Sequence, residues 1–244
     1  GVMNTDNTTI SGETIDYGPC AFMEAFDPGT VFSSIDHTGR YAYGAQPMVA
    51  QWNLARLAET LIPLMAAGTE DAVAAATASL DRFAARFGDA WRTGMHRKLG
   101  LAAVPPPDED LIRGLLGLLE RADADYTGAM RALGAWVRGD EAPLRALVPD
   151  AVALEEWTAG WERWLARQPA TRAELATGMD AVNPLFIPRN QVVEDALAAA
   201  TGGDLGPVEE LLGVIADPYT ARPGLERFAE PAPTGDRFVT FCGT

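Results

Sequence analysis

The sequence predicts a mainly α-helical protein from three differences in composition along the chain. Residues 47–217 are rich in Ala, Leu, Arg and Glu, and their apolar residues recur at the three- and four-residue spacing of helices. Residues 1–46 are rich in Gly, Thr, Asp and Pro, so any short strands would lie there. Residues 218–244 contain four prolines and resemble an extended tail.

The individual helices are predicted from their start and stop signals. Pro47 suits a first helical position, and Gly68 is a plausible stop for this first helix. Thr69 is expected to cap the next helix, which Gly88 is expected to bend or interrupt. Further helices are expected at about 108–119, 127–137, 154–164, 171–179, 190–201 and 207–215.

A tryptophan stripe marks one of these helices. Leu154, Trp157, Trp161 and Trp164 are spaced so that they share one helix face. Aromatic residues at this spacing are typical of a core or a partner interface rather than of a cofactor site.

Composition excludes several classes of function. The 244 residues carry a net charge of −15, which disfavours binding to nucleic-acid phosphates. No apolar run reaches the roughly 18 residues that span a bilayer, and no signal peptide is visible, so we expect a soluble cytoplasmic protein without membrane contact. Two cysteines and two histidines are too few for a His/Cys metal centre.

Oxygen-bearing side chains gather near the start of the chain. Asp6 and Asn7 are adjacent, and Asp16 follows in an Asp-x-Gly turn. A short β-hairpin with arms at 8–10 and 14–15 would bring the three together. Two carboxylates and one carboxamide form a hard-oxygen set that suits Mg²⁺ on nucleotide phosphates. Each fragment alone is also a common turn sequence, so a structural turn is the alternative.

The same residue types form the catalytic end of protein kinases. There, an Asp acts on the attacking hydroxyl, an Asn binds one Mg²⁺, and a second Asp binds the other. Four residues separate the first Asp from the Asn in ordinary kinases, whereas Asp6 and Asn7 are adjacent. This spacing argues against a standard kinase.

The opening residues resemble the selenoprotein O family of kinase-like proteins. The resemblance rests on Gly-Val-Met-Asn-Thr-Asp-Asn at 1–7 and Asp-Tyr-Gly-Pro at 16–19. It continues at 22–24, 27–29, 36–37, 39–42, 46–47, 52–57, 183–184 and 187–190, and returns in the tail, where Cys242 stands third from the end. Residues of about 60–180 match only as generic helix.

The resemblance implies the C-terminal lobe of a protein-kinase-like fold. Residues 1–46 would form the metal-binding hairpin and activation segment, 47–217 the helical lobe, and 218–244 an extended tail with additional C-terminal helices before it. The implied activity transfers AMP from ATP to Ser, Thr or Tyr hydroxyls of proteins. Asp6 would be the catalytic base; Asn7 and Asp16 would hold Mg²⁺, or Mn²⁺, with Asp16 also near the nucleotide phosphates.

The ATP-gripping parts that the family places upstream are missing from these residues. The sequence has no Gly-rich loop or strand lysine before the site, and its single lysine, Lys98, lies in a helical region well after it. We therefore expect the 244 residues alone to be inactive without an N-terminal ATP-clamping lobe. The alternative is a non-catalytic helical interaction module or a degenerate remnant.

Four other residues have competing interpretations. Cys20 is expected to be a small buried residue, and Cys242 is either a reactive thiol or an inert one. Asp36-His37 is interpreted as structural or substrate-positioning rather than as a catalytic dyad. Arg189 is expected to pair with a buried carboxylate rather than reach the nucleotide, with Asn190 as a possible helix cap.

Overall fold

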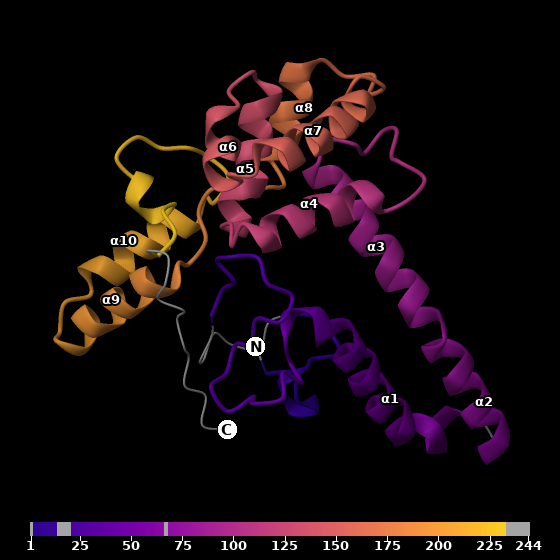
Figure 1. Cartoon of the computed structure of the whole chain (residues 1–244). Helices are drawn as coiled ribbons and strands as arrows, with labels where there is room; N and C mark the ends of the chain where they lie inside the picture. Colours follow the sequence, from indigo (N-terminus) through magenta and orange to yellow (C-terminus); the bar gives the residue numbers. More distant parts are fainter. Residues whose placement is uncertain (1, 14–20, 66–67, 233–244) are drawn as a thin grey trace. The chain divides into compact units, whose positions relative to one another are not determined.

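The computed structural model describes residues 2–13, 21–65 and 68–232, and helices dominate them (Figure 1). This confirms the predicted mainly α class. The described residues contain no strand, only an isolated antiparallel bridge between Ala25 and Asp125. The arm expected at 8–10 is coil and turn, and the arm at 14–15 lies outside the described residues, so the predicted hairpin is not confirmed. The kinase-like lobe stays an expectation from the family resemblance.

The chain divides into two compact units. The first comprises Gly1–Ala21, Pro28–Trp91 and Val239–Thr244, and the second comprises Phe22–Asp27 and Arg92–Phe238. The segments 1–46, 47–217 and 218–244 were predicted from composition and family resemblance. They refer to stretches of sequence and not to compact units, so they remain predictions.

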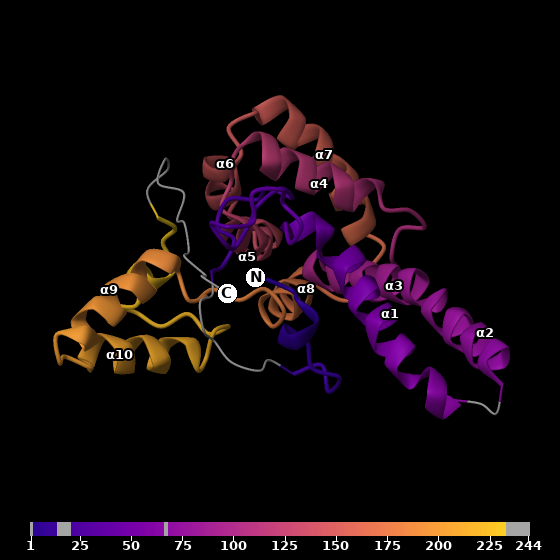
Figure 2. The ribbon, with the colours of Figure 1, turned by 90° about the horizontal axis from the view of Figure 1, so that it is seen from below.

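The first unit contains the Asp6 region and a helical pair. Its elements are two short 3₁₀ helices, η1 (Thr5–Asn7) and η2 (Tyr43–Ala45), followed by α1 (Gln46–Met65), α2 (Thr69–Leu80) and the start of α3 (Arg82–Lys98). Helices α1 and α2 lie side by side (Figures 1 and 2). Small residues, Ala72 and Ala76, are the buried positions of α2.

Two expected signals in this region were wrong. The chain leaves the helix at Asp81, between α2 and α3, whereas α3 continues through Gly88. A lone glycine weakens a helix by only about 1 kcal/mol relative to alanine, so it does not force a break. Thr69 is the first residue of α2 rather than its cap; Gly68 occupies the cap position, with no side-chain hydrogen bond.

The second unit contains the remaining helices. They are α4 (Asp110–Arg121), α5 (Tyr126–Val137), α6 (Ala142–Leu147), α7 (Ala151–Leu165), α8 (Arg172–Asp180), α9 (Asn190–Thr201), α10 (Gly206–Ile215) and the 3₁₀ helix η3 (Glu226–Phe228). Helix α5 packs against α6 and α8, and α4 packs against α7. Most residues of α5 are buried, so this helix is the centre of the unit.

The tryptophan stripe of α7 lies in this core, as predicted. Trp161 is fully buried, and its indole Nε1 donates to the Leu99 carbonyl at 2.9 Å. Trp157 stacks on Trp161 with ring centroids 5.3 Å apart and donates to the Leu111 carbonyl at 2.8 Å. Each buried indole N–H therefore has an acceptor, which offsets the cost of removing it from water.

A buried ion pair joins distant parts of the second unit. The two Arg189 Nη atoms donate to the two Asp125 carboxylate oxygens at 2.6 and 2.8 Å, and both side chains are nearly inaccessible. Asp125 also caps α5 by accepting from the Gly128 amide at 2.7 Å. A Cβ at Gly128 would lie 2.5 Å from that carboxylate, so this position requires glycine. The structural pairing expected for Arg189 is confirmed.

Helices α9 and α10 form a smaller core beside each other (Figure 2). Phe186, Leu211, Val214 and Phe228 are its buried members. Asn190 begins α9 but does not cap it, contrary to expectation. Its side chain instead exchanges two hydrogen bonds with the backbone of Phe22, at 2.9 and 2.8 Å, because that segment offers both a donor and an acceptor.

Candidate functional site

Asp6 and Asn7 lie on an exposed turn of 3₁₀ helix, η1. The Asn7 amide donates to the Asn4 carbonyl at 2.9 Å, and the Thr8 amide donates to the Thr5 carbonyl at 3.4 Å. These short-range bonds tighten the turn, so that two adjacent polar side chains project into solvent. Within the described residues the Asp6 carboxylate accepts no hydrogen bond, which leaves both of its oxygens available.

The side chain of Asn53, on α1, holds this turn through two hydrogen bonds. Its side-chain Nδ2 donates to the Met3 carbonyl at 3.0 Å and to the Thr8 hydroxyl at 2.9 Å. Asn53 is itself buried, and its two acceptors lie on either side of Asp6 in the sequence. A rigid helix therefore holds both ends of the turn that carries Asp6.

Tyr41 provides a second attachment. Its phenolic hydroxyl donates to the Asn4 side-chain oxygen. The Asp36 carboxylate in turn accepts from the backbone amides of Arg40 and Tyr41, at 2.8 Å each. Asp36 thus shapes a turn, while His37 is exposed beside it, which agrees with the structural role expected for Asp36.

The predicted metal site is only partly within the described residues. Asn7 donates through Nδ2 to the Val2 carbonyl at 3.4 Å, which leaves its Oδ1 as a free oxygen ligand. Asp16 lies outside the described residues, so its approach to Asp6 and Asn7 stays a prediction. In the described part of the chain, no group of three or more His, Cys, Asp or Glu side chains could hold a metal ion.

Sequence reasoning missed the roles of Asn53 and Tyr41. Both residues belong to stretches that resemble the family, but no role was expected for either. The available signal was Asn53 itself: it follows Val49 by four residues and is thus a polar residue on the buried face of α1. A buried amide on such a face requires a hydrogen-bonding partner, although the sequence does not indicate which one.

The single lysine makes its contacts within the second unit. Lys98 ends α3 in the second unit, where its ammonium donates to the Val182 carbonyl and to the Asn183 side chain, both at 3.2 Å. Burial lowers the pKa of Lys98. These contacts tie the end of α3 to the segment after α8, which is a structural function.

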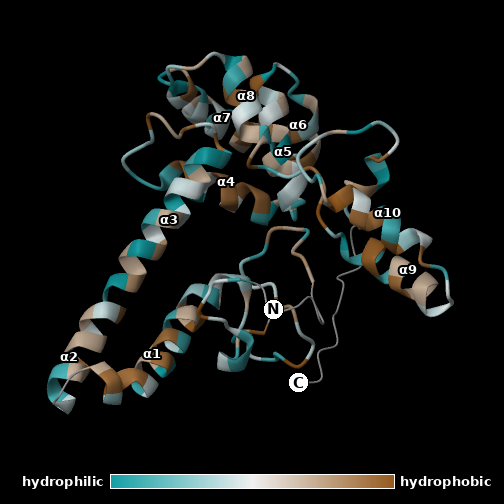
Figure 3. Cartoon of the chain, turned by 180° about the vertical axis from the view of Figure 1, so that it is seen from behind, coloured by the Kyte–Doolittle hydropathy of each residue, from teal (hydrophilic) through white to brown (hydrophobic). Residues whose placement is uncertain are grey.

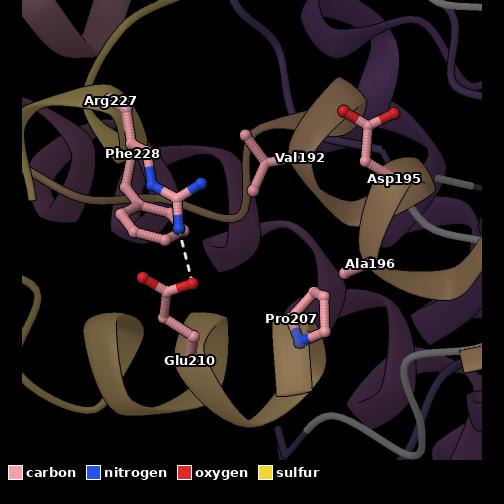
Figure 4. A pocket seen from close by; sticks show the side chains of 7 residues that line it. All are labelled: Val192, Asp195, Ala196, Pro207, Glu210, Arg227 and Phe228. Carbon is pink, nitrogen blue, oxygen red and sulfur yellow. Dashed lines mark hydrogen bonds and ion pairs between the residues drawn. The ribbon is translucent and has the colours of Figure 1, made fainter. Parts of the chain in front are cut away.

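A separate pocket of about 290 Å³ lies in the second unit, between α9, α10 and η3 (Figure 4). Arg227 and Glu210, which line it, form an ion pair, and Val192, Pro207 and Phe228 supply apolar lining. Neither Asp6 nor Asn7 is among its described lining residues. Cys20 and Cys242 lie outside the described residues, so the expectations for these two cysteines remain predictions.

Comparison with known proteins gives close relatives over the whole chain. A protein from Mycolicibacterium paratuberculosis named protein nucleotidyltransferase YdiU is 54% identical over 251 residues, covering 100% of this chain and 50% of that protein. Proteins of the same name from Pseudarthrobacter chlorophenolicus and Sphingopyxis alaskensis are 50% and 51% identical, with the same coverage. The chain therefore spans about half the length of the curated relatives it matches.

These relatives are named as nucleotidyltransferases, and a family model gives the family. The model described as protein adenylyltransferase SelO matches residues 1–216. The chain belongs to the SelO family, which confirms the resemblance seen in the opening residues. No helix in the described ranges is both long enough and apolar enough to cross a membrane.

Proposed function

We propose that this chain supplies the acceptor-activating and metal-binding part of a SelO-type protein adenylyltransferase. In this proposal, Asp6 is the catalytic base, and Asn7 and Asp16 hold Mg²⁺ or Mn²⁺ on ATP, with Asp16 near its phosphates. The acceptors are Ser, Thr or Tyr hydroxyls of protein substrates. The observation that carries the proposal is the exposed Asp6–Asn7 pair, held on both sides by Asn53, in which the Asp6 carboxylate and the Asn7 Oδ1 accept no hydrogen bond within the described residues.

The chemistry requires a proton acceptor beside the attacking oxygen. As the hydroxyl oxygen bonds to the α-phosphorus of ATP, Asp6 takes the hydroxyl proton, and the bond from the α-phosphorus to the bridging oxygen breaks to release pyrophosphate. A divalent cation, when bound, neutralises the charge that grows on the phosphates. Asn7 and Asp16 offer the hard oxygen ligands that Mg²⁺ prefers.

The 244 residues alone are expected to show negligible transfer. They offer ligands for the metal, but no Gly-rich loop or strand lysine to grip the nucleotide from the opposite side. We propose that an N-terminal ATP-clamping lobe supplies these nucleotide-gripping groups. Transfer of label from α-labelled ATP is therefore measured for these residues alone and together with the remaining half of a full-length relative.

The decisive variant is Asp6→Asn in the joined protein, by which we mean these 244 residues together with the remaining half of a full-length relative. It keeps the shape of the side chain but removes the base, so transfer should fall at least about 100-fold. Glu13→Gln is the matched control, because Glu13 is another exposed acid on the same segment. Equal activity of Asp6→Asn and the control would overturn the role of Asp6.

Ligand binding distinguishes this function from that of an inert helical module. Mg²⁺ with ATP should raise the melting temperature of the joined protein, because a ligand that binds only the folded state stabilises it. Asp16→Ala should remove that rise. An unchanged melting temperature at millimolar ligand would favour the non-catalytic interaction module.

A further inference from the structure

A cationic and aromatic cluster lies next to the turn that carries Asp6. The Arg40 guanidinium carbon lies 5.0 Å from the centroid of the Trp52 ring, and the Arg56 guanidinium carbon lies 5.2 Å from it. We call these three residues the cation–π stack. Trp52 remains 43% exposed and both arginines are exposed, so the stack faces solvent rather than a core.

The stack leaves hydrogen-bonding capacity unused. Arg56 forms an ion pair with Glu59 at 2.7 Å, but in the described part of the chain no carboxylate pairs with the Arg40 side chain. Stacking on an aromatic face uses none of the five N–H donors of a guanidinium. Arg40 is therefore a cation fixed over a ring, with its donors free for a carboxylate.

The stack is attached to the Asp6 turn through neighbouring residues. Tyr41, next to Arg40, donates to Asn4, and Asn53, next to Trp52, donates to Met3 and Thr8. The Asp36 carboxylate further fixes the Arg40 and Tyr41 amides. The same two short segments thus hold the turn and form the stack, which places the stack in a constant relation to Asp6.

The charge of the chain indicates what would occupy this position. With 34 acidic and 19 basic residues, the chain as a whole repels an acidic partner. A cation without a carboxylate partner, next to the turn, provides a local attraction that such a partner would otherwise lack. Arg binds carboxylates through paired N–H donors, so Asp and Glu side chains fit it well.

We infer that the cation–π stack binds an acidic side chain near the hydroxyl residue of a protein substrate, with Arg40 as the specificity-determining residue. This inference rests on the proposed function, and it names the substrate class: proteins in which Asp or Glu lies close to the target Ser, Thr or Tyr. Arg40 binds the carboxylate, and Trp52 keeps the guanidinium in place.

A pair of peptides tests the inference without nucleotide or metal. Fluorescein-labelled peptides containing Ser-Glu-Glu or Ser-Gln-Gln are titrated with the 244-residue chain, and fluorescence polarisation reports binding. The Glu peptide should bind about fivefold more tightly, and the difference should shrink as salt is added. Equal binding of the two peptides, or no binding of either at millimolar chain, would overturn the inference.

Matched variants assign the preference to the stack. Arg40→Gln should abolish the preference for the Glu peptide, and Trp52→Leu should reduce it, whereas Trp52→Phe should retain most of it because an aromatic face remains. Arg86→Gln removes one exposed arginine from α3 of the same unit and should leave the preference unchanged. An equal loss in Arg40→Gln and Arg86→Gln would overturn the inference, because net charge alone would then explain the binding.

Nucleotide competition separates this proposal from the proposed function. If Mg·ATP displaced the Glu peptide, and Arg40→Gln weakened ATP binding as much as it weakened peptide binding, the stack would be a nucleotide site and the inference would fail. Failure of AMP transfer in the joined protein would instead contradict the proposed function, while the peptide preference would still be measurable. Melting curves of every variant confirm that a loss of binding is not a loss of folding.

Discussion

At the residue scale, the candidate site depends on one buried amide. Asn53 supplies two of the donors that hold the Asp6 turn, to Met3 and to Thr8, while its own side-chain oxygen is buried without a partner in the described structure. A buried amide that is only partly satisfied costs free energy. Such a cost beside the Asp6 turn is consistent with a positioning role rather than a role in stability alone.

Replacing Asn53 with Leu should loosen this turn. The change removes two hydrogen bonds but also removes the unpartnered oxygen, so we expect a loss of only about 1 kcal/mol in the free energy of unfolding. The Asn7 and Thr8 amides should exchange with deuterium faster, because the turn that protects them becomes mobile. Urea unfolding and hydrogen exchange measure the two effects.

The control for this change is Gln51→Leu. Gln51 lies on the same helix with an amide side chain, but within the described residues it forms no side-chain hydrogen bond to the Asp6 turn. It should leave the exchange of Asn7 and Thr8 as in the unchanged protein. Unaltered exchange in Asn53→Leu as well would show that the turn does not depend on α1.

At the element scale, the Arg189–Asp125 pair joins the start of α9 to the cap of α5. Arg189 also donates to the Ala229 carbonyl at 2.8 Å, so the pair holds the segment after η3 as well. The bridge of Ala25 with Asp125 adds the 22–27 segment to the same point. Several segments far apart in sequence therefore meet at one buried charge pair.

Arg189→Met should destabilise the second unit strongly. It leaves the Asp125 carboxylate buried without its cation, and breaking such a pair typically costs about 3–5 kcal/mol. Asp125→Asn in the same chain should recover part of the loss, because Asn can still accept from the Gly128 amide without carrying a charge. Urea unfolding of the single and double variants tests this, and a loss below 1 kcal/mol in Arg189→Met would contradict it.

These elements also show what the sequence could and could not predict. The helix at 190–201 and the buried pairing of Arg189 were predicted, because periodicity and charge burial are local signals. The contact of Asn190 with Phe22 was not, since 168 residues separate the partners. The end of α2 at Leu80 was also missed, because no Gly or Pro lies within 78–83 to mark it.

The ion pair between Glu162 of α7 and Arg172 of α8 should make the free energy of unfolding depend on pH. Hydrogen bonds from Arg172, at 2.7 and 3.0 Å, lower the pKa of Glu162 below its ordinary 4.5. A group with a lowered folded-state pKa stabilises the fold above its unfolded pKa and loses that contribution as pH falls through the folded pKa. The stabilisation should therefore be complete at neutral pH and decline below about pH 4.5.

Glu162→Gln should remove this dependence. Both partners are substantially exposed, so the variant should lose at most about 1 kcal/mol at pH 7, and the difference from the unchanged protein should shrink as the pH falls below about 4.5. Unfolding curves between pH 3 and 7 measure this difference. Glu156→Gln, on the exposed face of the same helix, should show no such trend, and a matching trend in it would rule out the ion pair as the cause.

At the scale of the whole molecule, the division into two units was not predictable from composition. The short segment 22–27 belongs with residues 92–238, although its neighbours on both sides belong to the other unit. The Tyr126 amide donates to the Glu24 carbonyl at 2.7 Å, and the Phe26 amide donates to the Ala124 carbonyl at 2.9 Å. Backbone pairing of this kind depends little on side-chain identity, so composition does not indicate it.

The exposed apolar residues of α1 predict the behaviour of the chain in solution. Leu64 is 82% exposed at the end of this helix, with Leu61 and Met65 also exposed beside it, and Figure 3 shows this hydrophobic end. Contiguous exposed apolar surface favours association, so the apparent mass by light scattering should rise above 26.0 kDa with concentration. Leu64→Glu should suppress the rise by placing a charge in the contact.

Val152→Glu is the matched control for that change. Val152 is also exposed, but it stands in the first turn of α7, where a carboxylate interacts favourably with the helix dipole. The Val152→Glu variant should therefore associate like the unchanged chain, because its exposed apolar residues on α1 are intact. A constant 26.0 kDa at every concentration would show that these leucines do not drive association, and equal suppression by both variants would attribute the effect to added charge.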